Sequence, residues 1–160
     1  MKYELFFSTH YFIESNPTVS TFASMLPSWA IDECDKDRFR ALAPRDLVIV
    51  FSKEAKDVLT EQEFQTIVAH ELGHLEEGDL SDENLSKGIR YVDDVEIRAD
   101  KHGVAKCGAR AMYTALRKIA KLSVAASVRQ DNLSTVETIA ELRLVARKIA
   151  PRLAALRAAM

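Results

Sequence analysis

One stretch of this sequence, residues 60–78, decides most of the local structure, and it reads TEQEFQTIVAHELGHLEEG. Thr60, followed three residues later by Glu63, is the capping-box pattern with which helices begin. Gly78 stands where a helix commonly ends. Between them apolar residues recur at helical spacing and form one stripe, which we expect to face the core: Phe64, Val68, Leu72 and Leu75.

This predicted helix carries His70-Glu71-Leu72-Gly73-His74, an H-E-x-x-H motif. Residues four apart on a helix point the same way, so both imidazoles can reach one Zn²⁺ ion. Glu71 lies about 100° around the helix from His70 and can address a water beside the metal. The motif predicts His70 and His74 as zinc ligands and Glu71 as a general base. The alternative is that the two histidines only line an amphipathic helix.

A catalytic zinc ion needs a third protein ligand and one position left open for water. We expect Glu96 to be that ligand, because it lies early on a second predicted helix, after a polar loop over residues 79–91. Asp100, one turn later on the same face, is expected to accept the second N–H of a ligand imidazole. Ala99 permits the close helix approach that this arrangement needs.

Composition limits the classes of protein to which this chain can belong. Its 160 residues are 48% hydrophobic, which is sufficient for one core, and we expect a single domain over residues 1–160. The net charge of -2 supplies no positive field, so nucleic acid is not an expected partner. The longest apolar run, residues 47–51, is far shorter than the roughly 20 residues of a membrane span. Without a signal-peptide pattern at the N-terminus, we expect a cytoplasmic protein.

Three segments, in this order, resemble the catalytic core of HtpX-like gluzincin peptidases, the group that includes the CAAX-prenyl endopeptidases. They are His70 to His74, Glu96 to Gly103 and Gly108 to Lys118, and the resemblance covers about residues 40–120. Its specific part is the pair of metal motifs. The roles that it implies are zinc ligands at His70, His74 and Glu96, a base at Glu71, and support of a histidine by Asp100.

The chain departs from this family in two respects. Many relatives are integral membrane proteins, and this sequence lacks their spanning helices, so neither membrane quality control nor prenyl-protein processing follows from the resemblance. The family's tail often carries His-Pro followed by Arg, whereas this sequence has Ala150-Pro151-Arg152. The shorter H-E-x-x-H proteases that regulate phage repressors are a neighbouring alternative, although they usually carry Asn at the position of Asp100.

The predicted elements indicate an α+β fold: a small zincin-like domain, mostly helical, with a short sheet beside the H-E-x-x-H helix. Substrate peptides in zincins usually add as a strand to a sheet edge, and either predicted strand is a candidate for that edge. The strands are predicted over residues 3–9 and 46–52. Beyond the two helices of the site, further helices are predicted over residues 17–29, 109–127 and 134–160, the last broken or kinked at Pro151.

Together these patterns predict a zinc-dependent metalloendopeptidase that acts on flexible or unfolded protein segments, and they leave its oligomeric state open. The group that stabilises the oxyanion also stays open; His102, Tyr91 and Arg152 are candidates, as are Arg98 and Tyr113. One alternative is a catalytically weak or inactive zinc-stabilised binding or regulatory module of the same fold, which the missing tail histidine favours. A metal-free helical protein with a coincidental motif is the other.

Overall fold

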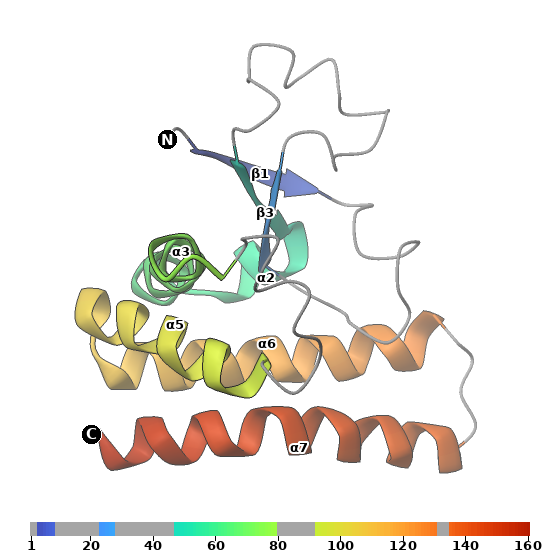
Figure 1. Cartoon of the computed structure of the whole chain (residues 1–160). Helices are drawn as coiled ribbons and strands as arrows, with labels where there is room; N and C mark the ends of the chain where they lie inside the picture. Colours follow the sequence, from blue (N-terminus) through green and yellow to red (C-terminus); the bar gives the residue numbers. More distant parts are fainter. Residues whose placement is uncertain (1–2, 9–22, 28–46, 80–91, 131–134) are drawn as a thin grey trace. The chain divides into compact units, whose positions relative to one another are not determined.

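The structure is a computed structural model (Figure 1), and it describes five segments of the chain: residues 3–8, 23–27, 47–79, 92–130 and 135–160. They belong to two compact units, Met1–Asp57 and Val58–Met160, and each unit is described by itself. The single domain expected over residues 1–160 stays a prediction.

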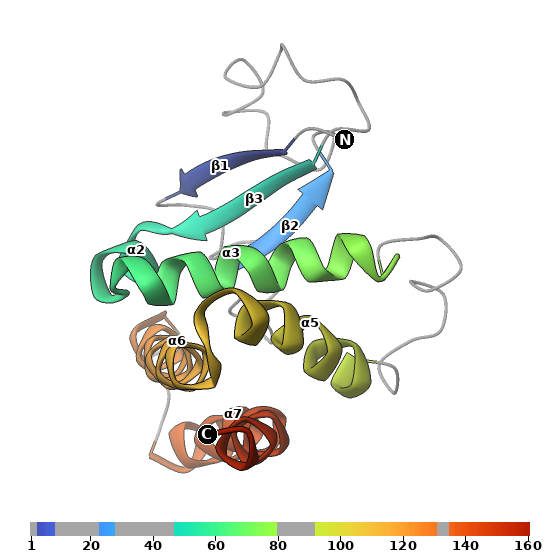
Figure 2. The same cartoon turned by 90° about the vertical axis from the view of Figure 1, so that its left-hand side faces the viewer.

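The first unit contains a three-stranded sheet in the order β1-β3-β2 (Figure 2). The central strand β3 (Leu47–Ser52) pairs in parallel with β1 (Tyr3–Ser8) and antiparallel with β2 (Ala23–Pro27). Ile49 and Phe51, two positions apart on β3, are both fully buried, as the period of a strand requires. Helix α2 (Lys53–Val58) follows β3 directly.

Both predicted strands are present in this sheet, as β1 and β3. The helix predicted over residues 17–29 is wrong for Ala23–Pro27, which forms β2; the rest of that range lies outside the described residues. Pairing with β3 satisfies the backbone of β2 and overrides its helical side-chain spacing. Because β3 has partners on both sides, it offers no edge for a substrate strand, whereas β1 is an edge among the described strands.

The second unit contains the four helices that the sequence predicts from residue 60 onward. They are α3 (Glu61–Glu76), α5 (Val92–Cys107), α6 (Ala109–Gln130) and α7 (Thr135–Ala158). The predicted break at Pro151 is wrong, because α7 runs through that residue. Proline removes the N–H that would bond the carbonyl of residue 147, and since residue 147 is exposed, water can take that place.

The α+β prediction is wrong for the part of the chain that carries the H-E-x-x-H motif. Within Val58–Met160 the described residues form helices and turns and include no strand, so this unit is all-α. In this unit α3 packs against α5 and α6, and α6 packs against α7. The strands belong to the other unit, so the sheet expected beside the motif helix forms no part of the unit that contains it.

Helices α3 and α5 make the most extensive contact of this unit and run antiparallel (Figure 2). The Thr66 hydroxyl donates to the carbonyl of Gly103 at 2.8 Å, and a Cβ at Gly103 would lie only 2.7 Å from the Thr66 carbonyl oxygen. A Cβ at Gly73 would lie 2.8 Å from the His102 ring. Ala99, about one turn before Gly103 on α5, is fully buried. Small residues therefore set the distance between the two helices that carry the candidate ligands.

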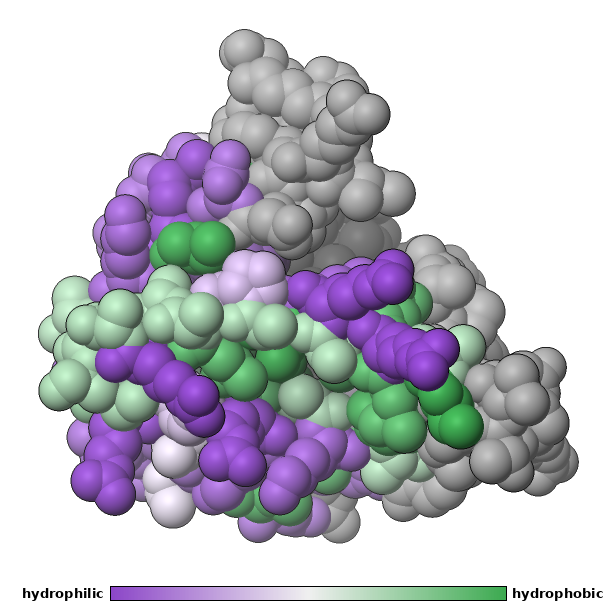
Figure 3. Space-filling view, turned by 90° about the horizontal axis from the view of Figure 1, so that it is seen from below, coloured by the Kyte–Doolittle hydropathy of each residue, from purple (hydrophilic) through white to green (hydrophobic). Residues whose placement is uncertain are grey.

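Helix α7 contributes little to the core of the unit. Among its described side chains only Leu156 is buried, while Ile139, Leu142 and Leu144 are exposed. This helix faces the viewer in Figure 3, where hydrophobic and hydrophilic surface lie side by side. None of the helices in the described part of the chain combines the length and the apolar character that crossing a membrane requires.

Candidate metal centre

The helix that carries the motif begins with the predicted capping box. Thr60 Oγ1 accepts the N–H of Glu63 at 3.3 Å, and Glu63 Oε2 accepts the N–H of Thr60 at 2.7 Å. Lys118 of α6 donates to the same carboxylate at 2.6 Å. Burial alone would raise the pKa of Glu63, but the hydrogen bonds from Lys118 and Thr60 hold it below its ordinary value. These bonds fix the residue at which α3 begins, and so the direction in which His70 and His74 point from the helix.

The other end of α3 closes with a turn that brings an acidic side chain back to the helix. Gly78 has a φ of +73°, which glycine adopts without strain. The N–H of Gly78 donates to the Leu75 carbonyl at 3.2 Å and that of Asp79 to the His74 carbonyl at 2.9 Å, which is the Schellman pattern. The same turn places Asp79 Oδ2 3.1 Å from His74 Nδ1. Asp79 thus contacts His74 twice, through its backbone N–H and through its carboxylate.

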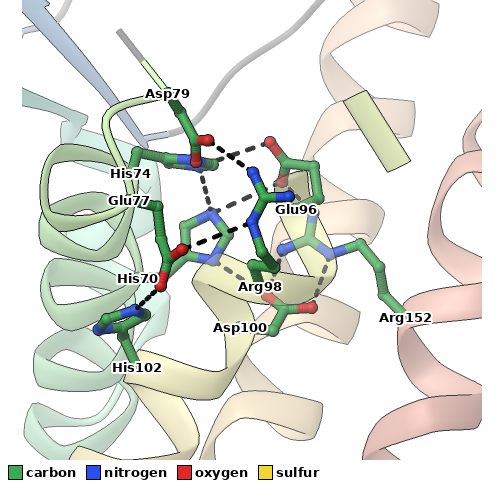
Figure 4. Close-up of polar contacts among 9 residues, drawn as sticks. All are labelled: His70, His74, Glu77, Asp79, Glu96, Arg98, Asp100, His102 and Arg152. Atoms are coloured by element: carbon green, nitrogen blue, oxygen red, sulfur yellow. Dashed lines mark hydrogen bonds and ion pairs between the residues drawn. The ribbon is translucent and has the colours of Figure 1, made fainter. Parts of the chain in front are cut away.

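Three candidate ligands converge between α3 and α5 (Figure 4). The Nε2 atoms of His70 and His74 are 3.2 Å apart; that of His70 lies 3.5 Å from Glu96 Oε2, and that of His74 lies 3.5 Å from the other oxygen, Oε1. Ligand atoms around a tetrahedral zinc ion with bonds of about 2.1 Å are separated by about 3.4 Å. The spacing of the three groups therefore fits a zinc ion.

Each imidazole is backed by a carboxylate on its other nitrogen. Asp100 Oδ1 lies 3.0 Å from His70 Nδ1, as Asp79 Oδ2 does at 3.1 Å from His74 Nδ1. An ionised carboxylate only accepts hydrogen bonds, so these contacts favour the tautomer with the proton on Nδ1 and a lone pair on Nε2; the contact of His70 with Asp100 is an ion-pair contact, without the geometry of a hydrogen bond. Two lone pairs and a carboxylate then face one another with no proton between them. Such a donor set favours a cation and suits zinc.

Both supporting carboxylates are held in turn by arginines. Arg152 of α7 donates to the two oxygens of Asp100, from Nε at 2.9 Å and from Nη2 at 2.6 Å. Arg98 Nη2 donates to Asp79 Oδ1 at 2.8 Å. We refer to these two chains of contacts by their ligands: the His70 arm is His70, Asp100 and Arg152, and the His74 arm is His74, Asp79 and Arg98.

The buried groups of the His70 arm hold opposite charges. Burial lowers the pKa of His70, and the close contact with Asp100 offsets this only in part, so the ring is neutral, as a ligand must be. For Asp100, burial would raise the pKa, but Arg152 and His70 hold it below its ordinary value. For Arg152, burial would lower the pKa, but Asp100 and Glu96 raise it. Asp100 is therefore an anion and Arg152 a cation.

Glu71, the predicted base, is buried on α3 beside the ligands, with 6% of its surface exposed. Its charge is one of those that raise the pKa of Arg152, after the larger effects of Asp100 and Glu96. A buried carboxylate next to a cation site is suited to accept a proton from water.

The structure brings together His70, His74, Glu96 and Asp100, the residues expected to form the metal site. Of the oxyanion candidates, Arg152 lies in the site, but each of its three guanidinium nitrogens already bonds a carboxylate. His102 lies 3.1 Å from Glu77 and 3.2 Å from Glu76, away from the point where the Nε2 atoms meet (Figure 4). The Tyr113 hydroxyl accepts hydrogen bonds from Arg157. Tyr91 lies outside the described residues.

Sequence reasoning missed Asp79, and it treated Arg98 only as a candidate for the oxyanion. Asp79 fell inside the predicted loop over residues 79–91. The signal that would have found it is the order of residues after the motif: Gly78 follows His74 by four positions, and an acidic residue comes next. A Schellman turn at Gly78 necessarily returns the following residue toward His74.

A cavity of about 290 Å³ lies between α5 and α7, beside the His70 arm. Its walls are mostly apolar, and the side chains of Asp100 and Arg152 also line it. Beside this cavity, the Arg152 side chain of α7 contacts Asp100 of α5, and space is left next to it.

The arrangement as a whole can hold a divalent cation and keep a carboxylate next to it. No family model, curated protein or solved structure matches this chain. Inference about its function therefore depends on the motif and on the geometry of the site.

Proposed function

We propose that this chain is a zinc-dependent metalloendopeptidase that binds zinc through His70, His74 and Glu96. The observation that carries the proposal is the convergence of these three groups, at 3.2 to 3.5 Å, with a carboxylate on each imidazole Nδ1. Two histidines and a glutamate form the ligand set of a well-known type of catalytic zinc site in peptidases. The resemblance of the same residues to HtpX-like gluzincin peptidases supports the same roles.

The residues divide the chemistry of peptide hydrolysis among them. A zinc ion, when bound, supplies a Lewis acid that lowers the pKa of water to about 7 and polarises a carbonyl. Glu71 accepts the proton of the attacking water and then delivers it to the leaving amine. Asp100 and Asp79 keep the Nδ1 protons on the two rings, so both Nε2 atoms stay available to the metal. Because His70 and Glu71 are buried, the substrate must present an extended, accessible backbone, as flexible or unfolded segments do.

The experiment that tests this function compares the wild-type chain with Glu71→Gln after each is loaded with zinc and incubated with an unfolded protein mixture. Loss of the base is expected to lower the rate of fragment formation by about 10²–10⁴-fold, with zinc still bound. Mass spectrometry of the fragments and elemental analysis of the protein provide the two readouts. Glu96→Ala and His74→Ala are the controls that lose the metal. Full activity of Glu71→Gln would contradict the mechanism.

A zinc-stabilised binding or regulatory module is the second candidate, and one observation favours it. The described candidates for oxyanion stabilisation are engaged elsewhere, His102 with Glu77 and Arg152 with Asp100 and Glu96. This candidate predicts one zinc ion per chain without turnover in the wild type. Cleavage by the wild type that disappears in Glu71→Gln would exclude it.

A further inference from the structure

We propose that Arg152 is a positioning residue for the metal site: it bridges the ligand Glu96 and the carboxylate of Asp100 and so sets the affinity of the site for zinc. The inference rests on the proposed function, because it assigns a role toward the same metal. Arg152 Nη1 lies 2.7 Å from Glu96 Oε2, while Nε and Nη2 bond the two oxygens of Asp100. One guanidinium therefore connects a candidate ligand to the support of another.

Glu96 is the ligand that most needs such support. Its side chain is 27% exposed, against 6% for His70 and 12% for His74. The last torsion of a glutamate side chain has a broad energy minimum, so the carboxylate turns easily unless something holds it. The ion pair between Arg152 Nη1 and Oε2 restrains this rotation, while Oε1 faces His74 Nε2 at 3.5 Å.

The chemistry of the bridge requires arginine. Three nitrogens of a planar fork meet three oxygens of two carboxylates: the two contacts to Asp100 are charge-assisted hydrogen bonds, and the contact to Glu96 is an ion pair at 2.7 Å. A lysine ammonium is a point charge on a flexible stem and cannot reproduce this planar geometry. Lysine at this position would therefore keep the charge and lose most of the positioning.

The bridge also connects the site to helix α7. Leu156 is the buried apolar side chain in the described part of that helix, and a cavity of about 290 Å³ lies beside Arg152. Helix α7 packs mainly against α6, and the ion pairs of Arg152 connect it to Asp100 and Glu96 on α5. Arg152 therefore links the position of α7 to the arrangement of Glu96 and Asp100 in the metal site.

If Arg152 is removed, a positioning role and simple electrostatic repulsion predict opposite changes in the affinity for zinc. Arg152 is a cation beside a site that would bind another cation, so by Coulomb repulsion alone its removal should tighten zinc binding. If Arg152 positions Glu96 and Asp100, its removal should weaken zinc binding instead. Loss of groups that orient metal ligands typically costs 10–100-fold in affinity.

The test measures the Kd for Zn²⁺ of the full chain by competition with a chromogenic chelator. Four proteins are compared: the wild type, Arg152→Met, Arg152→Lys and Arg157→Met. Arg157 is a matched control, because it also lies on α7 and its guanidinium contacts the Tyr113 hydroxyl and ring and no ligand. We expect a Kd raised about 10–100-fold in Arg152→Met, an intermediate rise in Arg152→Lys, and no change in Arg157→Met.

The absorption spectrum of Co²⁺ placed in the site gives a second readout. A carboxylate released from Arg152 can turn and bind through both oxygens, so the intense visible bands of a four-coordinate ion should weaken in Arg152→Met and remain in Arg157→Met. Circular dichroism shows that each variant is folded, and Arg152→Lys, which keeps the charge and most of the stem, serves if Arg152→Met does not fold.

The outcomes separate this inference from the function on which it rests. Failure of the wild type to bind zinc would overturn both. Zinc binding by the wild type with an unchanged or lower Kd in both Arg152 variants would overturn only the role of Arg152. A raised Kd in both, with Arg157→Met unchanged, would support it.

Discussion

The two arms of the site have the same chemistry but are built in different ways. In each arm an imidazole Nδ1 meets an aspartate, and an arginine holds that aspartate. Asp79 lies five residues after His74 and is placed by the turn that ends α3. In the His70 arm, Asp100 comes from α5 and Arg152 comes from α7, 52 residues further along the chain.

The difference shows how local and long-range order combine in one site. The His74 arm needs little more than α3 and the start of α5, because its carboxylate is part of the cap of the helix. The His70 arm needs three helices to be packed. The arginine of the His70 arm is also less exposed to solvent: the side chain of Arg152 is 14% exposed, whereas that of Arg98 is 33% exposed. Zinc affinity should therefore depend on both arms, and the stability of the metal-free chain mainly on the His70 arm.

The largest effect is expected from Asp100→Ala, which breaks the His70 arm. It leaves the buried guanidinium of Arg152 without its main partner, and breaking a buried ion pair costs about 3–5 kcal/mol. Urea unfolding of the metal-free chain measures this loss. The Kd for zinc should rise about 10–100-fold as well. A loss of stability below about 1 kcal/mol would show that Arg152 finds solvent, as exposed ion pairs do.

Asp79→Ala breaks the His74 arm and should affect zinc binding to a similar extent, about 10–100-fold. Its effect on the metal-free chain should be smaller, about 1–2 kcal/mol, because Arg98 is partly exposed and also lies 3.6 Å from Glu77. The pair of measurements, zinc titration and urea unfolding, decides whether the arms differ. Equal losses of stability in the two alanine variants would remove the distinction.

Two glycines allow the local part of the His74 arm to be tested alone. Gly78 and Gly108 both have positive φ, +73° and +88°, and a Cβ at either would meet no atom within 4 Å. Alanine at either position should therefore cost about 1 kcal/mol of unfolding free energy by backbone strain. Only Gly78→Ala should also raise the Kd for zinc, because only that turn positions Asp79. Similar affinities in the two variants would show that Asp79 is placed independently of its turn.

The smallest effect concerns the start of α3, which lies outside both arms. The pKa of Glu63 is below its ordinary value, so its contribution to stability is complete above about pH 4.3 and is lost as the pH falls further and the folded protein takes up the proton. Glu63→Gln keeps an amide that can cap the helix and loses the ion pair with Lys118, so it should reduce this acid-dependent loss. The free energy of unfolding of the wild type and of Glu63→Gln, measured at a series of pH values, checks this expectation. The zinc affinity near pH 7 should stay unchanged.

The predictable part of the site is the part made by helix geometry. The start of α3 follows from Thr60 and Glu63, and the common direction of His70 and His74 follows from their spacing. Glu96 and Asp100 are also one turn apart on one helix. The location of Arg152 could not be predicted in the same way, since it depends on how α7 packs against α5, which no local pattern encodes.

The prediction of the fold class was wrong for a similar reason, since it too depended on long-range packing. The residues of β1 and β3 have local strand character, but strand character does not tell on which element a sheet packs. The sheet was expected beside the motif helix, and the unit that contains α3 consists of helices among its described residues. For β2, pairing with β3 outweighed the helical pattern predicted over residues 17–29, which only long-range contacts could reveal.

The place of Arg152 in the chain has a consequence for synthesis on the ribosome. Both histidines, Glu96 and Asp100 are made before it, and Arg152 follows Asp100 by 52 residues. At the usual elongation rates of about 5–20 residues per second, the candidate ligand set precedes its bridging arginine by about 3–10 s. During that interval the nascent chain has the candidate ligands but lacks the group that orients Glu96, so full zinc affinity should develop only after Arg152 has been made.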